Sequence, residues 1–181
     1  WKPYEGRRTG GTHRGYWDYE GGGMCDMGQH HFDPEQWTYA KDYTSAVEIT
    51  PFAPPAHPEV TGMWAWVELK YADGFRFVME STEWGPKYDQ APIRDVNMND
   101  LSPEDQEKIK AMPDPEPLLS FGEAVKQRKK AGGHAEAAHR AACILHLANL
   151  AIRLGRKLNY DPDKEIFVND EEANRFLHPP M

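Results

Sequence analysis

The sequence has 181 residues, enough for one domain with a sizeable hydrophobic core. Its net charge of −8 and pI near 5.5 argue against a nucleic-acid partner, because phosphate binding needs clustered Lys and Arg. No apolar run approaches the ~20 residues of a membrane span, and no signal peptide opens the chain. We therefore expect a soluble domain, and its first residue, Trp1, suggests that it is cut from a longer protein.

Helix predictions begin after an irregular segment. Residues 1–20 are rich in Gly, Arg and aromatic residues without a steady period, and we expect at most a short strand near Tyr16 and Trp17. A helix is predicted from about Met24. The run from Asp33 through Pro34 has the form of an N-cap followed by a first-turn proline, so a second helix is predicted to start there; one kinked helix is the alternative.

Three strands are predicted next, at residues 45–52, 62–71 and 75–83. The last two alternate apolar and polar residues and are separated by Ala72-Asp73-Gly74, so they should form a β-hairpin. Aromatic residues point to both faces of this hairpin, which indicates that a second layer or a partner covers the outer face.

Residues 85–119 are dense in Pro, Asp and Asn and form a long excursion, of the kind that wraps a surface, covers a site or stays mobile. Within it, Ser102 is placed to cap a helix over residues 102–112. A further short helix is predicted over residues 120–130, ended by Ala131-Gly132-Gly133.

The strongest helix prediction covers residues 135–157, which are apolar on nearly every side and should pack closely on a sheet. A segment at 158–160, an edge strand at 165–168 and a short acidic helix at 170–177 follow. Together these elements predict an α+β fold: an open, mainly antiparallel sheet with helices packed on one face.

Asp26 and His30 are the leading candidates for chemistry. On a helix they lie one turn apart, close enough to share a proton or a substrate hydroxyl, as an acid/base pair would. Gly28 between them indicates a close approach by a ligand or by a packed neighbour. His31 points about 100° away from His30, so a role in packing is expected for it.

Other interpretations of these residues remain open. A helix-terminal acid and a satisfied histidine would explain Asp26 and His30 without catalysis. Together with His31 and Asp33 they offer possible metal ligands, but His30 and His31 diverge on a helix, and we assign no metal site. Each of the two cysteines, Cys25 and Cys143, lacks a second thiol at metal-ligand spacing and is expected to be a small apolar packing residue.

Several blocks together resemble the carboxyl-terminal domain of the Gfo/Idh/MocA oxidoreductases. They are Trp17-Asp18-Tyr19-Glu20-Gly21-Gly22-Gly23, Asp26-Met27-Gly28-Gln29-His30 with Asp33, Ala135-Glu136-Ala137-Ala138-His139-Arg140, Leu154-Gly155-Arg156-Lys157 and Asn169-Asp170-Glu171-Glu172-Ala173-Asn174. The resemblance spans the full length and is specific because the blocks keep the family's order. The subgroup that the chain is most similar to is a sugar-linked bacterial one, often exported by the twin-arginine route, so a cytoplasmic or an exported location is implied.

The resemblance implies oxidation of a secondary alcohol on a sugar, an inositol or a glycoside. It implies that NAD or NADP is bound by an amino-terminal Rossmann domain, whose Glu-Lys-Pro motif carries a catalytic lysine. This chain contains neither a Glu-Lys-Pro sequence nor a complete dinucleotide fingerprint, so we expect that domain to lie outside it. The family's D-x-x-x-H motif maps onto Asp26 and His30. We therefore expect this chain alone to bind no cofactor, and we expect His30 to act as base and Asp26 to orient it or to hold a substrate hydroxyl.

Further substrate contacts are predicted at Tyr16 and Trp17, by stacking, and at His139 and Arg140, near a helix start; for all four a structural role is the alternative.

In the resembling family the exposed sheet face forms a subunit interface, so a homo-oligomer is expected. The rival functions are a non-catalytic carbohydrate-binding or oligomerisation module on the same scaffold and, less favoured, a metal-dependent hydrolase.

Overall fold

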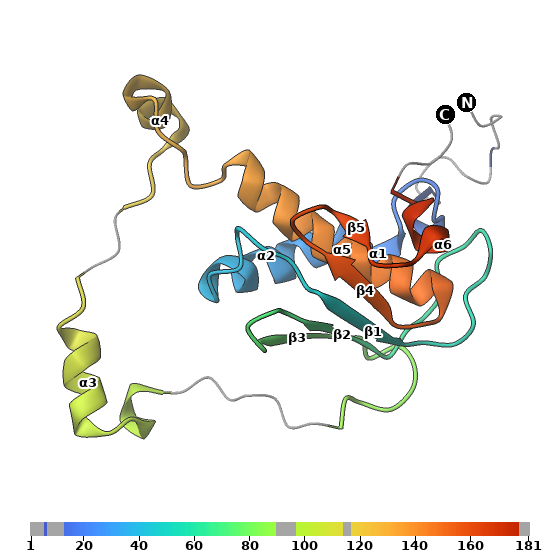
Figure 1. Cartoon of the computed structure of the whole chain (residues 1–181), viewed down its shortest axis with the longest axis horizontal. Helices are drawn as coiled ribbons and strands as arrows, with labels where there is room; N and C mark the ends of the chain where they lie inside the picture. The colour runs from blue at the N-terminus through green and yellow to red at the C-terminus, as the bar shows by residue number, and fades with distance from the viewer. Residues whose placement is uncertain (1–5, 7–12, 90–96, 114–116, 178–181) are drawn as a thin grey trace. The chain divides into compact units, whose positions relative to one another are not determined.

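The structure, a computed structural model, describes residues 6, 13–89, 97–113 and 117–177. The chain divides into two compact units, one made of residues 1–88 and 135–181 and the other of residues 89–134. The first unit is built on a five-stranded sheet with the order β3-β2-β1-β4-β5, in which each pair of neighbours is antiparallel (Figure 1). This confirms the predicted α+β class.

The strands predicted at residues 45–52, 62–71, 75–83 and 165–168 all form, with shorter bounds, and the segment at 158–160 forms a fifth strand. They are β1 (Glu48–Phe52), β2 (Trp66–Lys70), β3 (Arg76–Glu80), β4 (Leu158–Asp161) and β5 (Ile166–Phe167). The hairpin between β2 and β3 turns as predicted: Gly74 has a φ of 88°, and Asp73 Oδ1 accepts a hydrogen bond from the Phe75 amide at 3.0 Å. The short strand expected near Tyr16 and Trp17 is a single bridge from Tyr16 to Val60.

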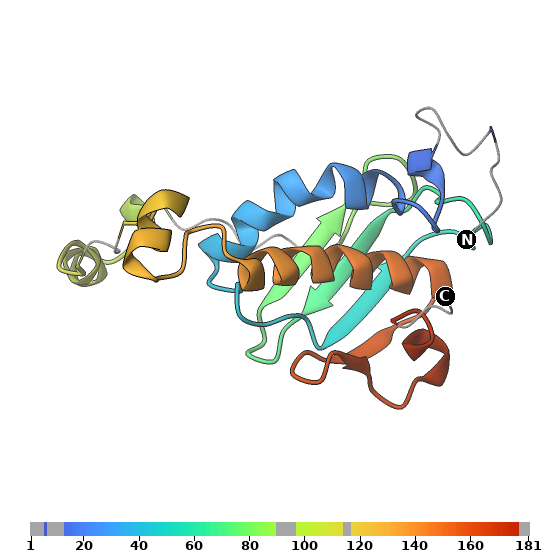
Figure 2. The ribbon, with the colours of Figure 1, turned by 90° about the horizontal axis from the view of Figure 1, so that it is seen from above.

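Three helices cover one face of the sheet: α1 (Gly22–Asp26), α2 (Gly28–Thr38) and α5 (Ala135–Leu154) (Figure 2). The core lies between this layer and the strands. It is formed by fully buried side chains of the sheet, such as Ile49, Val67 and Leu69, and of α5, such as Ile144. The buried side chains of β2 and β3 alternate with more exposed ones, in agreement with the alternation in the sequence. The small helix α6 (Glu171–Asn174), capped by Asp170, follows β5.

The helix predicted to start at Asp33 does not exist. α2 begins at Gly28 and continues through Pro34, and the break in the helical run lies at Met27, six residues earlier than the cap motif implied. Asp33 is therefore a residue inside α2 and not a cap. Tertiary packing overrides the local proline signal, because the ring of Phe32 contacts that of Phe77 on β3, with centroids 5.6 Å apart.

The opposite face of the sheet carries an aromatic cluster. Phe52 on β1 stacks on Trp66 of β2, with centroids 5.2 Å apart, and Trp84 and Tyr88 contact this pair from the segment after β3. Tyr88 also donates its hydroxyl to Glu68. The chain thus supplies part of the cover that the two-sided aromatic pattern predicted, while Phe52 remains 39% exposed.

The second unit contains η3 (Met98–Asp100), α3 (Pro103–Lys110) and α4 (Phe121–Gln127). Ser102 caps α3 and Ser120 caps α4 through their side chains, which confirms both helix starts. α4 ends at Arg128, in a left-handed conformation with a φ of 52°, before the glycines that were expected to stop it. Among the described helices of the whole chain, none is long and apolar enough to cross a membrane.

Candidate functional site

Asp26 and His30 lie on consecutive helical turns. Asp26 is the last residue of α1, His30 is the third of α2, and the connecting residue Met27 has right-handed helical angles, so the course of the backbone is almost continuous. The Asp26 side chain is 20% exposed, and its Oδ2 forms an ion pair with Arg14 Nη1 at 2.8 Å. The His30 side chain is exposed and has no hydrogen-bond or ion-pair partner among the described residues.

Arg14 also lies 3.6 Å from Glu20 Oε2 through its Nε, so one guanidinium stands beside two carboxylates. No hydrogen bond joins Asp26 to His30 within the described part of the chain. Asp26 Oδ1 is likewise without a partner there. The pair therefore offers one carboxylate oxygen and one imidazole on the same helical edge, each available to an outside molecule.

Glycines let the helix that carries Asp26 and His30 pack directly on α5. Gly21, at the start of α1, has a φ of 81°, and a Cβ there would lie 2.6 Å from Asn149 Nδ2 of α5. A Cβ at Gly28 would lie 3.2 Å from Leu145 Cδ2. The close approach that Gly28 predicted is thus made by a neighbouring helix; a ligand contact there stays a prediction.

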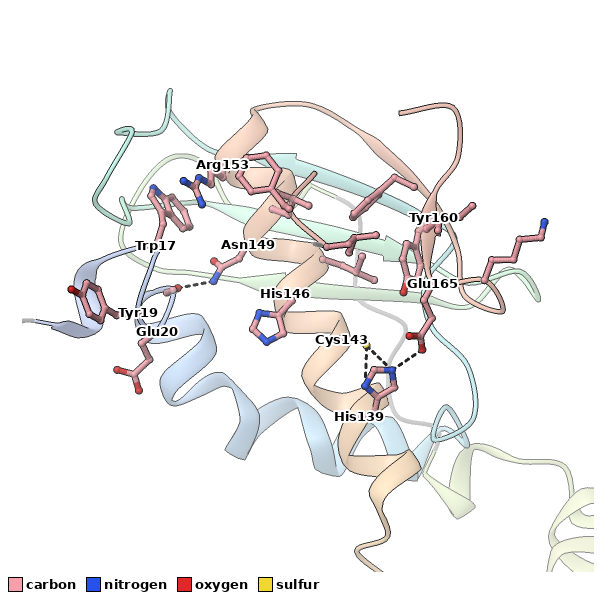
Figure 3. A pocket seen from close by; sticks show the side chains of 18 residues that line it. Trp17, Tyr19, Glu20, His139, Cys143, His146, Asn149, Arg153, Tyr160 and Glu165 are labelled. Carbon is pink, nitrogen blue, oxygen red and sulfur yellow. Dashed lines mark hydrogen bonds and ion pairs between the residues drawn. The ribbon is translucent and has the colours of Figure 1, made fainter. Parts of the chain in front are cut away.

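A cavity of about 590 Å³ lies between α5, the segment 17–21 and the β4–β5 region, and we call it the α5–β5 groove (Figure 3). Its volume falls in the range of small-molecule sites. Apolar side chains such as Leu147, Leu150 and Phe167 line part of it, and polar groups stand at both ends.

His139 and Glu165 form a hydrogen-bonded pair at one end of the groove. His139 Nε2 is 2.6 Å from Glu165 Oε1, and Arg140 Nη1 approaches the same carboxylate at 3.4 Å (Figure 3 shows the histidine pair). Cys143 lies 3.5 Å from His139 Nε2, but burial, and next the negative charge of Glu165, raise the pKa of its thiol. A protonated thiol is a poor nucleophile, so we assign Cys143 no nucleophilic role.

At the other end, the Arg153 guanidinium lies over two aromatic rings. Its central carbon is 4.8 Å from the ring centroid of Phe176 and 5.7 Å from that of Trp17. The indole of Trp17 is itself held, because its Nε1 donates to the His57 carbonyl at 2.8 Å. Between the two ends, His146 faces the groove, and loss of hydration lowers its pKa although part of the ring remains exposed.

The comparison with protein families decides the identity. A model described as the oxidoreductase family, C-terminal alpha/beta domain, of the Gfo/Idh/MocA group, matches residues 1–181. The chain belongs to the Gfo/Idh/MocA oxidoreductase family. Searches of curated proteins and of solved structures found no match.

Members of the Gfo/Idh/MocA family are NAD(P)-dependent, but the described residues of this Gfo/Idh/MocA domain do not fit a dinucleotide site. The Gly21–Gly23 turn is preceded by one bridge and not by a strand, and the space beside Gly21 and Gly22 is filled by Asn149 and Thr61. Gly21 and Gly22 thus allow close approach of α5 and of Thr61, and α1 is only five residues long. No step of the chemistry can be assigned to a cofactor held by these residues.

The structure brings together only some of the predicted site residues of this Gfo/Idh/MocA domain. Trp17 and His139 line the α5–β5 groove, whereas Asp26, Gly28 and His30 do not. Tyr16 pairs with Val60 through its backbone and contacts the ring of Tyr19, at 6.4 Å between centroids, and Arg140 binds Glu136 and the Pro162 carbonyl. Substrate contacts by these residues remain predictions.

Sequence reasoning missed Arg153, Asn149 and Glu165 as groove residues. A polar Asn149 within the apolar stripe of α5 was the one available signal. For a metal, no group of three or more His, Cys, Asp or Glu side chains is close enough together within the described ranges, so nothing there supports the metal-hydrolase rival.

Proposed function

We propose that this domain carries the substrate site and the acid/base pair of an NAD(P)-dependent oxidoreductase that acts on a secondary alcohol of a sugar, an inositol or a glycoside. The observation that supports this best is the placement of Asp26 and His30 at one helical edge, in a chain that matches the family over its full length. The nucleotide domain that binds NAD(P) and supplies the hydride acceptor would be a separate domain of the complete enzyme.

In this proposal His30 removes the proton from the alcohol. A secondary alcohol loses its hydroxyl proton as the hydride leaves carbon, and imidazole is suited to accept a proton near neutrality. The His30 ring is exposed and has no competing partner among the described residues, so a substrate hydroxyl can reach it.

Asp26 binds substrate in this proposal and does not hold the His30 ring. The sequence left both roles open; the lack of an Asp26–His30 hydrogen bond within the described chain favours the first. Arg14 fixes one oxygen of the carboxylate at 2.8 Å, which leaves Oδ1 to accept a hydrogen bond from a neighbouring hydroxyl of the substrate.

The test compares His30→Asn with His31→Asn in the complete enzyme, because His31 is the adjacent exposed imidazole on the same helix. The His30 variant should lose about 10²- to 10⁴-fold in kcat. The rise of kcat with pH near neutrality should also disappear, because that rise reports deprotonation of a general base. The His31 variant should stay within about twofold of the parent. Equal losses, or no loss at His30, would refute the proposal.

A non-catalytic carbohydrate-binding or oligomerisation module is the second candidate, and the α5–β5 groove is the observation that favours it. An unchanged kcat in the His30 variant, together with retained binding of a carbohydrate, would support this candidate.

The aromatic face of the sheet is proposed as the site of a second copy of the chain. Phe52 and Trp66 stay partly exposed there, beyond the cover given by Trp84 and Tyr88. Trp66→Lys should therefore lower the mass measured by light scattering after size exclusion. Trp37→Lys, which changes a 60%-exposed tryptophan of α2, should not change the mass. A parent chain that is monomeric would end this part of the proposal.

A further inference from the structure

We propose that the α5–β5 groove binds an acidic oligosaccharide, with a sugar carboxylate held by Arg153. Neither Asp26 nor His30 lines this groove, so the inference goes beyond the proposed redox function and stands without it. Four observations support it: the stacking and free donors of Arg153 within the described residues, the charges around the groove, the polar groups along the groove, and the length of the groove.

Arg153 is a preorganised guanidinium whose donors are not used by any residue that the structure describes. Phe176 and Trp17 lie against it, and no acceptor among the described residues pairs with its N–H groups. A cation is favourable in the last turn of α5, but the helix terminus alone does not explain a stacked guanidinium with unused donors. A planar carboxylate can accept two parallel hydrogen bonds from the edge of such a group.

The charges that line the groove favour one negative charge on the ligand. The other cation of the lining, Lys164, is paired with Asp161 at 3.1 Å, and the lining also includes the carboxylates of Glu20 and Glu165. A dianionic phosphate would be repelled by both carboxylates, and the single guanidinium of Arg153 would balance only one of its two charges. A monocarboxylate carries one charge, so it meets less repulsion and Arg153 can balance it.

The polar groups along the groove can bind the hydroxyls of a sugar ring whose face lies on the apolar side chains of the groove. Asn149 donates through Nδ2 to Gly21 and Cys25, and no donor in the described chain reaches its Oδ1. The His139–Glu165 pair offers further sites at the far end (Figure 3). A sugar ring presents hydroxyls at its edge and C–H bonds on its face, which matches this alternation of polar groups and apolar wall.

The length of the groove indicates more than one sugar unit. Its lining on α5 runs from His139 to Arg153, a stretch of helix about 21 Å long. A single sugar ring would contact only one part of this stretch. An oligosaccharide can place a carboxylate at Arg153 and still reach the His139–Glu165 pair.

The test titrates the full 181-residue chain with two trisaccharides that each carry a single carboxylate, glucuronosyl-xylobiose and cellotriose oxidised at its terminal C6, and follows the indole N–H of Trp17 by NMR. Trp17→Phe assigns that resonance. At least one acidic trisaccharide should shift it saturably, and its methyl ester should bind about tenfold more weakly, because the ester removes the charge. Addition of salt should weaken the acidic trisaccharide more than the ester.

Arg153→Gln should weaken the acidic trisaccharide about tenfold, and Arg153→Lys should have an intermediate effect. The matched control is Arg175→Gln, which removes the same charge from an exposed position that does not line the groove and should change affinity less than about twofold. The comparison of acid with ester on the parent chain does not depend on any variant folding.

The proposal is overturned if neither acidic trisaccharide binds, if acid and ester bind equally, or if the two arginine variants lose affinity alike. Tighter binding of glucose 6-phosphate than of either trisaccharide would also overturn it, since it would identify a phosphate site.

Discussion

Asn149 Nδ2 of α5 donates a hydrogen bond at 2.6 Å to the carbonyl of Gly21, the N-cap residue of α1. The same amide lies 2.9 Å from Cys25 Sγ, one residue before Asp26. One side chain of the long helix therefore fixes the start of the helical run that carries the proposed catalytic pair.

Replacement of Asn149 by Ala should destabilise the domain by about 0.5–1.5 kcal/mol, because it removes the hydrogen bond from α5 to the Gly21 carbonyl. Urea denaturation followed by circular dichroism measures the change. Asn159→Ala, at an exposed position of β4, is the control and should cost less than about 0.5 kcal/mol. Similar losses in the two variants would show that the Asn149–Gly21 bond has no special weight.

The glycines at the start of this helical run should respond to alanine in a fixed order. A methyl group added at Gly23, in α1, would lie in open space, so alanine there should stabilise the domain by up to about 1 kcal/mol. At Gly28 that gain is opposed by contact with Leu145. At Gly22, with a φ of 77° and Thr61 Oγ1 at 2.7 Å from the new Cβ, alanine should be strongly destabilising. Thermal unfolding of the three variants gives the order, and a tolerated alanine at Gly22 would contradict the description of this turn.

Tyr71→Phe should cost about 1–3 kcal/mol of unfolding free energy. The Tyr71 hydroxyl donates to Oε1 of the fully buried Gln36 at 2.6 Å, and phenylalanine would leave that oxygen unpaired. Tyr43→Phe, which alters a 64%-exposed tyrosine, is the control in the same denaturation assay. The double variant Tyr71→Phe with Gln36→Leu should recover part of the loss, and failure to recover any would point to a cause other than the unpaired amide.

Stability should fall in acid partly through Glu48. Hydrogen bonds from Lys157 and then Lys70 lower the pKa of this carboxyl to about 2. Since the folded pKa lies below the unfolded one, the stabilisation is complete above the unfolded pKa, near 4.5, and is lost as the pH falls toward 2.

Glu48→Gln should therefore flatten the decline of the unfolding free energy between pH 4.5 and 2. The effect should be no more than about 1 kcal/mol, because the pair is open to solvent. Glu35→Gln, at an exposed position of α2, provides the comparison. Parallel pH curves for the parent and the Glu48 variant would contradict the assignment.

The fold was largely readable from the sequence because its signals are local. Alternation at residues 66–70 and 76–80, the Asp73-Gly74 turn, and the Ser102 cap each act within a few residues. Asp33-Pro34 was misleading for the same reason: a local motif was outweighed by the packing of Phe32 on Phe77, which lies far along the chain.

The α5–β5 groove could not be predicted because no local pattern encodes it. Trp17, Arg153 and Phe176 meet only after the sheet has brought β4 beside β1 and β5 beside β4. The D-x-x-x-H spacing, in contrast, was visible at once, since both residues lie on one helical run.

The position of β1 between β2 and β4 also has a consequence during synthesis. β2 and β3 follow β1 closely along the chain, but β4 begins at Leu158, after the whole 89–134 unit has been translated. Until then one edge of the central strand has no hydrogen-bonding partner and α5 is not yet complete to cover its apolar face. We expect a nascent chain at this stage to be the species most in need of a chaperone.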